Sequence, residues 1–266
     1  MRILFLGDVV GSLGVDMVDQ YLPKLKHDFK PQVTIVNGEN STPVGRGISY
    51  KIYKQLMNDG ADVITLGNHA WNNEEIYDFI DDSKNLVRPL NYPGKDVPGS
   101  GYTVINVNGK KLAVVNLQGR IFIDPIDDPF QKIDELLNKI EKEVDYVFVD
   151  FHAETTSEKK AMGLFLTGRA SAVVGTHTHV QTNDNQILNN QTAYITDVGM
   201  CGPFNSVLGM KYDSIIHRFL TQRPTRFEVQ NEGDQILSGC LIDLRDDGTA
   251  RSIKTILIDP SHPYNR

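Results

Sequence analysis

The stretch SAVVGTHTH, residues 171–179, joins an apolar run directly to two histidines. Its first half is a short apolar run rich in β-branched residues, which predicts a buried β-strand. The run ends in two histidines, His177 and His179. Alternate residues of an extended segment point to the same side, so both imidazoles can face one object. A metal ion suits such a pair, and its remaining ligands must then come from elsewhere in the chain.

Four other short apolar runs have the same character. They are RILFLG, QVTIVN, DVITLG and DYVFVDF, which begin at residues 2, 32, 62 and 145. Longer segments with helical periodicity separate the runs. One of them, 128–143, begins with Asp128 as a helix N-cap and Pro129 at the first helical position. This alternation predicts an α/β architecture in which strands are buried between helices.

Two segments have a different pattern, typical of antiparallel hairpins. Residues 102–119 form two alternating runs around Asn108-Gly109, and residues 235–258 repeat the pattern around Asp247-Gly248. Asn-Gly and Asp-Gly are strong signals for a two-residue hairpin turn. The hairpins predict a second sheet or a mixed one. Because no linker, repeat or low-complexity tract interrupts the chain, we expect residues 1–266 to form a single domain.

Composition limits the functional classes. Acidic residues (34) outnumber basic ones (27), which gives a net charge of −7 and argues against an extended nucleic-acid-binding face. A small phosphorylated substrate remains compatible with this charge, because bound metal ions can reverse the local field. The N-terminal apolar run is too short for a signal peptide, and no run approaches the ~20 residues of a membrane span. We therefore expect a cytoplasmic protein without membrane contact. Homo-oligomer formation is left open.

Polar residues of metal-ligand type follow each apolar run. In an open α/β sheet, ligands bind beyond the carboxyl ends of the strands. Singly, each of these residues has an ordinary explanation as a turn residue, a core histidine or a surface charge. Turn chemistry does not account for four histidines and a glutamate together. The eight candidates are Asp8, Glu39, Asn40, Asn68, His69, His152, His177 and His179.

The donor types indicate which metal they would hold. Imidazole, carboxylate and amide oxygen together suit iron, manganese or zinc. The two cysteines, Cys201 and Cys240, are better explained as small buried thiols than as ligands. Eight donors are too many for one ion. They fit two ions ~3.5–4 Å apart, an arrangement that clamps the attacking and leaving oxygens in displacement at phosphorus.

The motifs carry a resemblance to a known family. The segments FLGDVVG, NGEN, LGNHAW, GTHTHVQT and ITDVGMCGP resemble those of the calcineurin-like metallophosphoesterase superfamily, and more closely its YmdB-like bacterial phosphodiesterase subfamily. The similarity runs essentially end to end. It implies two facing mixed β-sheets flanked by helices, a four-layer α/β/β/α sandwich.

The sequence departs from the superfamily pattern at two positions. Val10 stands where the superfamily has a histidine ligand, and Glu39 stands where it has an aspartate. The subfamily pattern implies that Asn40 fills the vacated ligand position. It further implies that Asp8, Asn40 and His179 hold one metal, that Asn68, His152 and His177 hold the other, that Glu39 bridges both, and that His69 is the general acid.

The resemblance also implies an activity. Two transition-metal ions, iron in the first instance or manganese in its place, would support hydrolysis of 2′,3′-cyclic nucleotides to nucleoside monophosphates. His69 would protonate the departing ribose oxygen during in-line displacement. Two alternatives stay open: a phosphomonoesterase or protein phosphatase on the same centre, and a metal-bound regulatory protein with little turnover.

Two further features have more than one interpretation. Arg169 could reach a substrate phosphate, although a surface ion pair is the simpler role. The glycine-rich segment 197–206 could line the pocket, or its glycines could serve turns alone.

Overall fold

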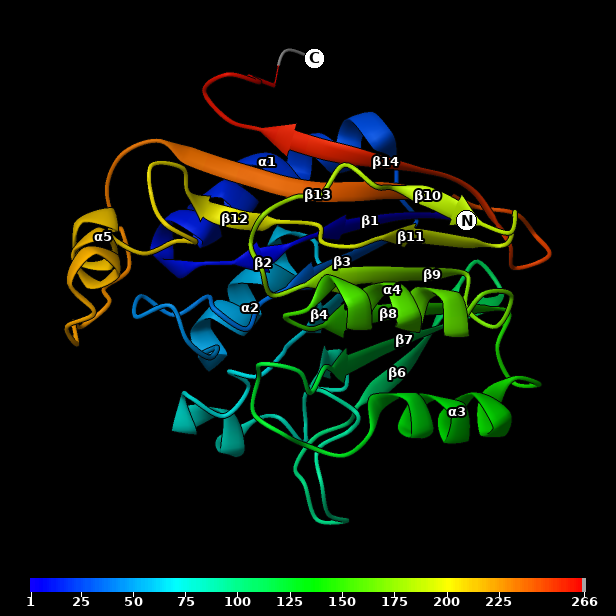
Figure 1. Cartoon of the computed structure of the whole chain (residues 1–266). Coiled ribbons are helices and arrows are strands. Elements are labelled where there is room, and N and C mark those ends of the chain that lie inside the picture. The colour runs from blue at the N-terminus through cyan, green and yellow to red at the C-terminus, as the bar shows by residue number, and fades with distance from the viewer. Residues whose placement is uncertain (265–266) are drawn as a thin grey trace.

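Two β-sheets lie face to face, and helices cover the outer face of each (Figure 1). The structure is a computed structural model and describes residues 1–264. The first sheet has the order β2 (Asp8–Val9), β12 (Met200–Pro203), β13 (Gln235–Leu244), β1 (Arg2–Leu6), β3 (Val33–Asn37), β4 (Val63–Thr65) and β5 (Leu86–Val87), and β14 (Ala250–Ile258) also pairs with β13. The second has the order β10 (Gln186–Leu188), β11 (Thr192–Ile195), β9 (Ala172–Thr176), β8 (Tyr146–His152), β7 (Lys110–Gln118) and β6 (Tyr102–Val107).

The helices divide between the two sheets. Helices α1 (Gly11–Phe29) and α2 (Tyr50–Asp59) pack on the first sheet, and α3 (Pro129–Ile140) and α4 (Thr156–Phe165) pack on the second. A short 3₁₀ helix, η1 (Glu74–Asp78), and α5 (Tyr212–Thr221) complete the elements. Across residues 1–264, none of the helices combines the length and apolarity that crossing a membrane requires. The predicted four-layer sandwich is confirmed.

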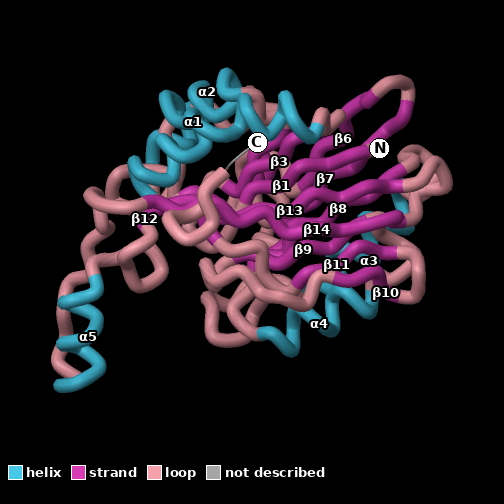
Figure 2. Tube along the Cα trace, turned by 90° about the horizontal axis from the view of Figure 1, so that it is seen from above, coloured by secondary structure: helices cyan, strands magenta, loops and turns pink. Residues whose placement is uncertain are grey.

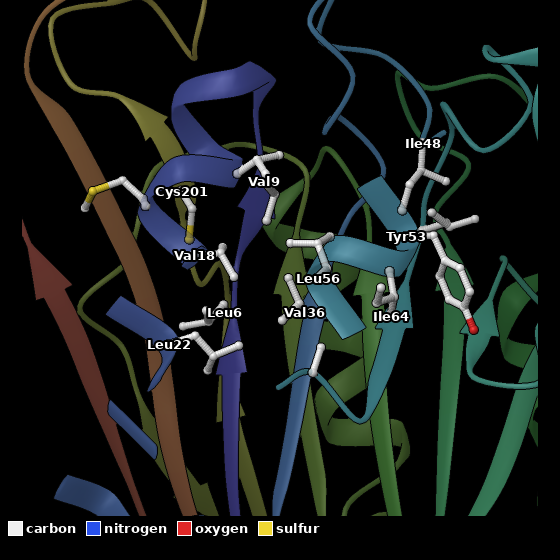
Figure 3. Packing of buried hydrophobic residues seen from close by; sticks show 14 of the residues in the cluster. Leu6, Val9, Val18, Leu22, Val36, Ile48, Tyr53, Leu56, Ile64 and Cys201 are labelled. Atoms are coloured by element: carbon white, nitrogen blue, oxygen red, sulfur yellow. The ribbon is translucent and has the colours of Figure 1, made fainter. Parts of the chain in front are cut away.

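Strand alternation builds the layers. Successive side chains of a strand point to opposite faces, so one strand can feed two cores. Phe5 of β1 points between the sheets, where its ring lies 5.3 Å from that of Phe148. Its neighbour Leu6 points to the helical side. There Leu6 lies beside Leu22 of α1, and Val36 of β3 lies beside Leu56 of α2 (Figure 3).

The two hairpins fold as predicted but join different sheets. In the turn between β6 and β7, Asn108 and Gly109 have φ of 53° and 82°, the left-handed backbone of a tight hairpin turn. Strands β13 and β14 pair antiparallel through the turn that contains Gly248, and β13 also runs antiparallel to β1. Both sheets are therefore mixed.

Parallel pairing aligns the strand ends that carry polar residues. In the first sheet β1, β3 and β4 are parallel, and in the second β7, β8 and β9 are parallel. The carboxyl ends of parallel strands share one edge of their sheet. Residues far apart in the sequence can therefore meet at that edge.

Candidate metal centre

His152 lies at the middle of a cluster of donors. Its Nε2 is 2.9 Å from Glu39 Oε1, 2.9 Å from Asn68 Oδ1 and 2.9 Å from His177 Nδ1. These side chains arrive from the ends of β3, β4, β8 and β9. Glu39, His152 and His177 each offer one ligand atom within 4.8 Å of the others. The structure therefore brings together four of the residues that the sequence predicted as ligands.

A buried hydroxyl and carboxylate orient the His152 ring. The Thr176 hydroxyl donates to Asp150 Oδ1 at 2.6 Å, and so it can accept from His152 Nδ1 at 3.0 Å. The other oxygen of Asp150 accepts from Thr65 Oγ1 and from Asn37 Nδ2. With a proton held at Nδ1, the ring presents Nε2 to the candidate ligand atoms of Glu39, Asn68 and His177. This is the orientation that a metal-ligating histidine normally receives from its hydrogen-bonded partners.

Asp8 and His179 form the second part of the cluster. Asp8 Oδ1 is 3.7 Å from His179 Nε2 and 3.7 Å from His152 Nδ1. This oxygen is fully buried and has no hydrogen-bond partner among the described residues. His179 Nδ1 donates to the Leu208 carbonyl at 3.0 Å, which leaves Nε2 on the Asp8 side. A buried carboxylate oxygen without a partner is costly, and a cation at this point would offset that cost.

Asn40 lies beside His179, and its amide nitrogen points toward the cluster. Its Nδ2 donates to Glu39 Oε1 at 3.2 Å and to His179 Nε2 at 3.2 Å. Metal ligation by Asn40 would use Oδ1, so the amide would have to turn over. The oxygen and nitrogen of an amide are similar in size, and such a turn exchanges their places without moving the backbone.

His177 and His179 lie in a turn and not on an extended strand. Strand β9 ends at Thr176, and His177 and His179 have φ of 99° and 63°. Left-handed backbone is uncommon for a residue other than glycine and persists only where the surroundings hold it. Asp197 does so here, because its Oδ2 accepts from the backbone nitrogen of Thr178 at 3.0 Å and from its hydroxyl at 2.7 Å. The expected alternation was wrong, although both rings reach the cluster.

His69 is close to the cluster but its ring makes separate contacts. Its backbone nitrogen donates to Glu39 Oε2 at 3.0 Å, while its ring Nδ1 lies 2.9 Å from Asn72 Oδ1. The adjacent residue, Asn68, points to His152 instead. The two neighbours therefore make separate contacts, Asn68 with His152 and His69 with Asn72. Gly67 makes room for them, because a Cβ there would lie 2.3 Å from Glu39 Oε2.

The electrostatics of the cluster favour positive charge. Burial alone would lower the pKa of His152, but the charges of Glu39 and Asp8 outweigh it and raise this pKa to about 9. Burial, reinforced by the neighbouring His152, lowers the pKa of His177 to about 3. Burial raises the pKa of Asp8. The cluster thus gathers buried acceptors around one protonated imidazole, and a metal cation can take the place of that proton.

Sequence reasoning missed Asp150, which interrupts the apolar run of β8. Asp150 lies two residues before His152 on the same strand, so both side chains share a face of the sheet. That spacing was the available signal. It also missed Glu154, whose Oε2 lies 3.0 Å from His177 Nε2 and so holds the ring with Nδ1 toward the cluster.

A cavity of about 490 Å³ opens onto the cluster. On one side it is lined by Glu39, Asn40, His69, His177 and His179. On the other it is lined by residues between 207 and 227, which the sequence did not indicate.

The remaining candidates have other surroundings. Arg169 Nη1 lies 2.7 Å from Asp134 Oδ1 in an ion pair, which agrees with its simpler role. Segment 197–206 contains β12, and none of its residues is among those that line the cavity. Cys201 and Cys240 are fully buried free thiols, as expected.

Comparison with known proteins identifies relatives over the full length. The family model described as YmdB-like protein matches residues 4–256. The 2′,3′-cyclic-nucleotide 2′-phosphodiesterase of Bacillus subtilis (strain 168) is 58% identical over 99% of each chain. A solved structure of a hypothetical protein from Thermus thermophilus is 41% identical with a TM-score of 0.90, covering 97% of this chain and 99% of that one. A structure titled as a novel phosphatase from Mycoplasma pneumoniae is 35% identical with a TM-score of 0.92, covering 98% and 95%. The resemblance read from the motifs is confirmed.

Proposed function

Because the chain belongs to the YmdB-like protein family, we propose that it is a metal-dependent phosphodiesterase that hydrolyses 2′,3′-cyclic nucleotides to nucleoside monophosphates. One observation carries the proposal: carboxylate, amide and imidazole donors from both sheets converge on His152, while the ring of the neighbouring His69 lies outside the cluster. A purely structural metal site would not need that additional histidine. The name of the 58% identical relative supports the same substrate class.

The donor set fits two ions, which this proposal assigns as iron with manganese as a replacement. The unpartnered Oδ1 of Asp8 and the donors around His152 Nε2 are the features that support the fit. Asp8, Asn40 and His179 would hold one ion, Asn68, His152 and His177 the other, and Glu39 both. When bound, the two metal ions would neutralise charge on the phosphoryl oxygens and activate water near neutral pH.

The protein groups around the donors would position the acid and exclude water. Asn72 Oδ1 accepts from His69 Nδ1, so the transferable proton of His69 is at Nε2. The hydrogen bond from the His69 backbone nitrogen to Glu39 Oε2 ties the backbone of this residue to the cluster. His69 Nε2 would protonate the ribose oxygen as its bond to phosphorus breaks, because an alkoxide is a poor leaving group.

Hydrolysis of 2′,3′-cyclic AMP by protein purified anaerobically with iron or manganese tests the function. We expect one adenosine monophosphate per cyclic nucleotide, measured by ³¹P NMR. We also expect a far higher kcat/KM for bis-p-nitrophenyl phosphate than for p-nitrophenyl phosphate. The reverse preference would establish the phosphomonoesterase. Absence of turnover of either compound by metal-loaded protein would favour the regulatory alternative.

We further propose that the chain is a single domain and acts in the cytoplasm. Residues 1–266 would form a single domain, and a single cooperative transition in denaturant, seen by fluorescence and circular dichroism alike, would agree with it. The protein would act in the cytoplasm on a small substrate. Cell fractionation with an antibody against the chain tests the location.

A further inference from the structure

Residues 204–230 form an arm that stands apart from the two sheets. The arm contains α5, which lies beyond the end of β12 and away from the other helices (Figure 2). Strand-like bridges join Val207 to Met210 and Met210 to Val229 at its base. Several apolar side chains of the arm are exposed, among them Phe219 at 70% and Leu220 at 81%.

The inner side of the arm forms one wall of the cavity that opens onto the metal centre. This wall includes Leu208, Met210, Ile215, Arg218, Phe219 and Phe227. The arm is tied directly to a predicted ligand, because the Leu208 carbonyl accepts from His179 Nδ1 at 3.0 Å. The wall and the donor cluster are therefore parts of one site.

The wall combines aromatic rings with an unpaired cation. The Arg218 guanidinium lies over the Phe227 ring, 5.2 Å from its centroid. Arg46 lines the cavity as well. Across residues 1–264 neither arginine takes part in an ion pair, although the chain has a net charge of −7. Flat apolar and guanidinium surfaces bind the faces of nucleobases by stacking, whatever the base.

We propose that this arm is the nucleoside-binding wall of the site, with the base stacked against Phe227 and Phe219 while the phosphodiester lies at the metal centre. The proposal rests on the proposed function for the identity of the phosphodiester. A base is the occupant that the geometry favours, since the wall continues into the catalytic cavity. A macromolecular partner on α5 would more naturally use side chains that do not line the cavity, such as Leu220.

Hydrolysis rates for a substrate with a nucleobase and for one without it test the role of the wall. The substrates are 2′,3′-cyclic AMP and methyl ribofuranoside 2′,3′-cyclic phosphate, which keeps the phosphodiester and lacks the base. Wild-type protein should prefer the nucleotide in kcat/KM. Phe227→Ala and Phe219→Ala should each reduce this preference about tenfold through KM, equivalent to about 1.4 kcal/mol, and leave kcat within twofold.

Two variants complete the kinetic test. Phe227→Leu keeps an apolar side chain under Arg218, so it should still lose most of the preference even if Phe227→Ala loosens the arm. Leu220→Ala, on the same helix but outside the cavity, should keep the wild-type preference. An unchanged preference in all the phenylalanine variants would overturn the proposal. So would dissociation of an oligomer by these variants with the preference intact, which would make the arm a contact between copies.

A binding measurement separates failure of the wall from failure of the function. Saturation of the protein methyl protons, with adenosine 3′-monophosphate as the NMR probe, should transfer to adenine H2 and H8 more strongly than to the ribose protons. Phe227→Leu should weaken the transfer to the base. If this pattern is seen without cyclic-nucleotide hydrolysis, the arm binds the nucleobase and the proposed function is wrong. If hydrolysis is seen without transfer to the base, the wall fails alone.

Discussion

Lys159 and Asp197 form an ion pair of 2.6 Å in which both side chains are 1% exposed. Lys159 belongs to α4 on the outer face of the second sheet, and Asp197 follows β11. The same Asp197 oxygen accepts from the backbone nitrogen of Thr178, between the two histidines with left-handed backbone. A helix outside the donor cluster thereby supports the turn that carries His177 and His179, two of the proposed ligands.

Removing the lysine should destabilise the protein and loosen that turn. Lys159→Met leaves the Asp197 carboxylate buried without its cation, a change that typically costs about 3–5 kcal/mol. We expect this loss in the free energy of unfolding, measured with urea, together with a lower metal content because His177 and His179 are less well held. Lys160→Met is the matched control, since the Lys160 side chain is 53% exposed and its Nζ makes only a long contact of 4.0 Å with Asp184 Oδ2. A loss below about 1 kcal/mol in Lys159→Met would contradict this account.

A half-buried acid, Asp59, predicts a pH effect on stability. Burial raises the pKa of Asp59 to about 6, and the charge and hydrogen bond of Asp19 add to the shift. Asp59 binds its proton more tightly in the folded protein, so its contribution is fully present below about pH 4 and is lost as pH rises to about 6. A rise in the pKa from its usual 3.8 to about 6 is equivalent to about 3 kcal/mol, which solvent screening at this partly exposed site reduces to about 1 kcal/mol.

Asp59→Asn should therefore stabilise the protein at pH 7 and not at pH 4. Urea unfolding at both values measures the difference, and stability that is unchanged at pH 7 would show that partial burial of the Asp59 carboxylate beside Asp19 costs little. Asp16→Asn, at an exposed position of α1, serves as the control. It should change the free energy of unfolding by less than about 0.5 kcal/mol at either pH.

The positions of the donors could be predicted because strand periodicity fixes them. Glu39, His152 and His177 each follow or end a β-branched run, and parallel strands present such positions at one edge. The local turn at His177 could not be predicted, because it depends on Asp197, which is twenty residues further along. Left-handed backbone at a non-glycine residue is set by such tertiary contacts.

The topology was less accessible to sequence reasoning. Strand β13 lies beside β1, which is more than 230 residues away, and local pattern carries no information about that pairing. The cavity wall was not predicted either, because Phe219 and Phe227 belong to a segment whose apolar residues are mostly exposed. They lie near the candidate metal centre because the hydrogen bond from His179 Nδ1 to the Leu208 carbonyl joins two loops that are distant in the sequence.

Asn40 provides a test of the first ion site. As a neutral amide ligand it should bind weakly, so Asn40→Ala should reduce metal content from about two ions per chain toward one without changing the circular dichroism spectrum. Elemental analysis after anaerobic reconstitution measures this. If Asn40→Ala keeps both ions and full activity, Asn40 is only the hydrogen-bond donor to Glu39 and His179 that the structure displays. A wild-type content of at most one ion would count against the dinuclear centre as a whole.

His69 should separate chemistry from metal binding. Its ring is held by Asn72 and not by the donor cluster, so His69→Ala should keep both ions. The kcat for 2′,3′-cyclic AMP should fall ~10²–10⁴-fold, the usual contribution of a positioned acid. With bis-p-nitrophenyl phosphate the loss should be much smaller, because p-nitrophenolate leaves without a proton. Glu39→Ala is the contrasting variant and should lose metal and activity together, since its carboxylate contacts His152 and the His69 backbone. Equal metal loss in both variants would make His69 a ligand, and the acid would then have to be another residue of the cavity.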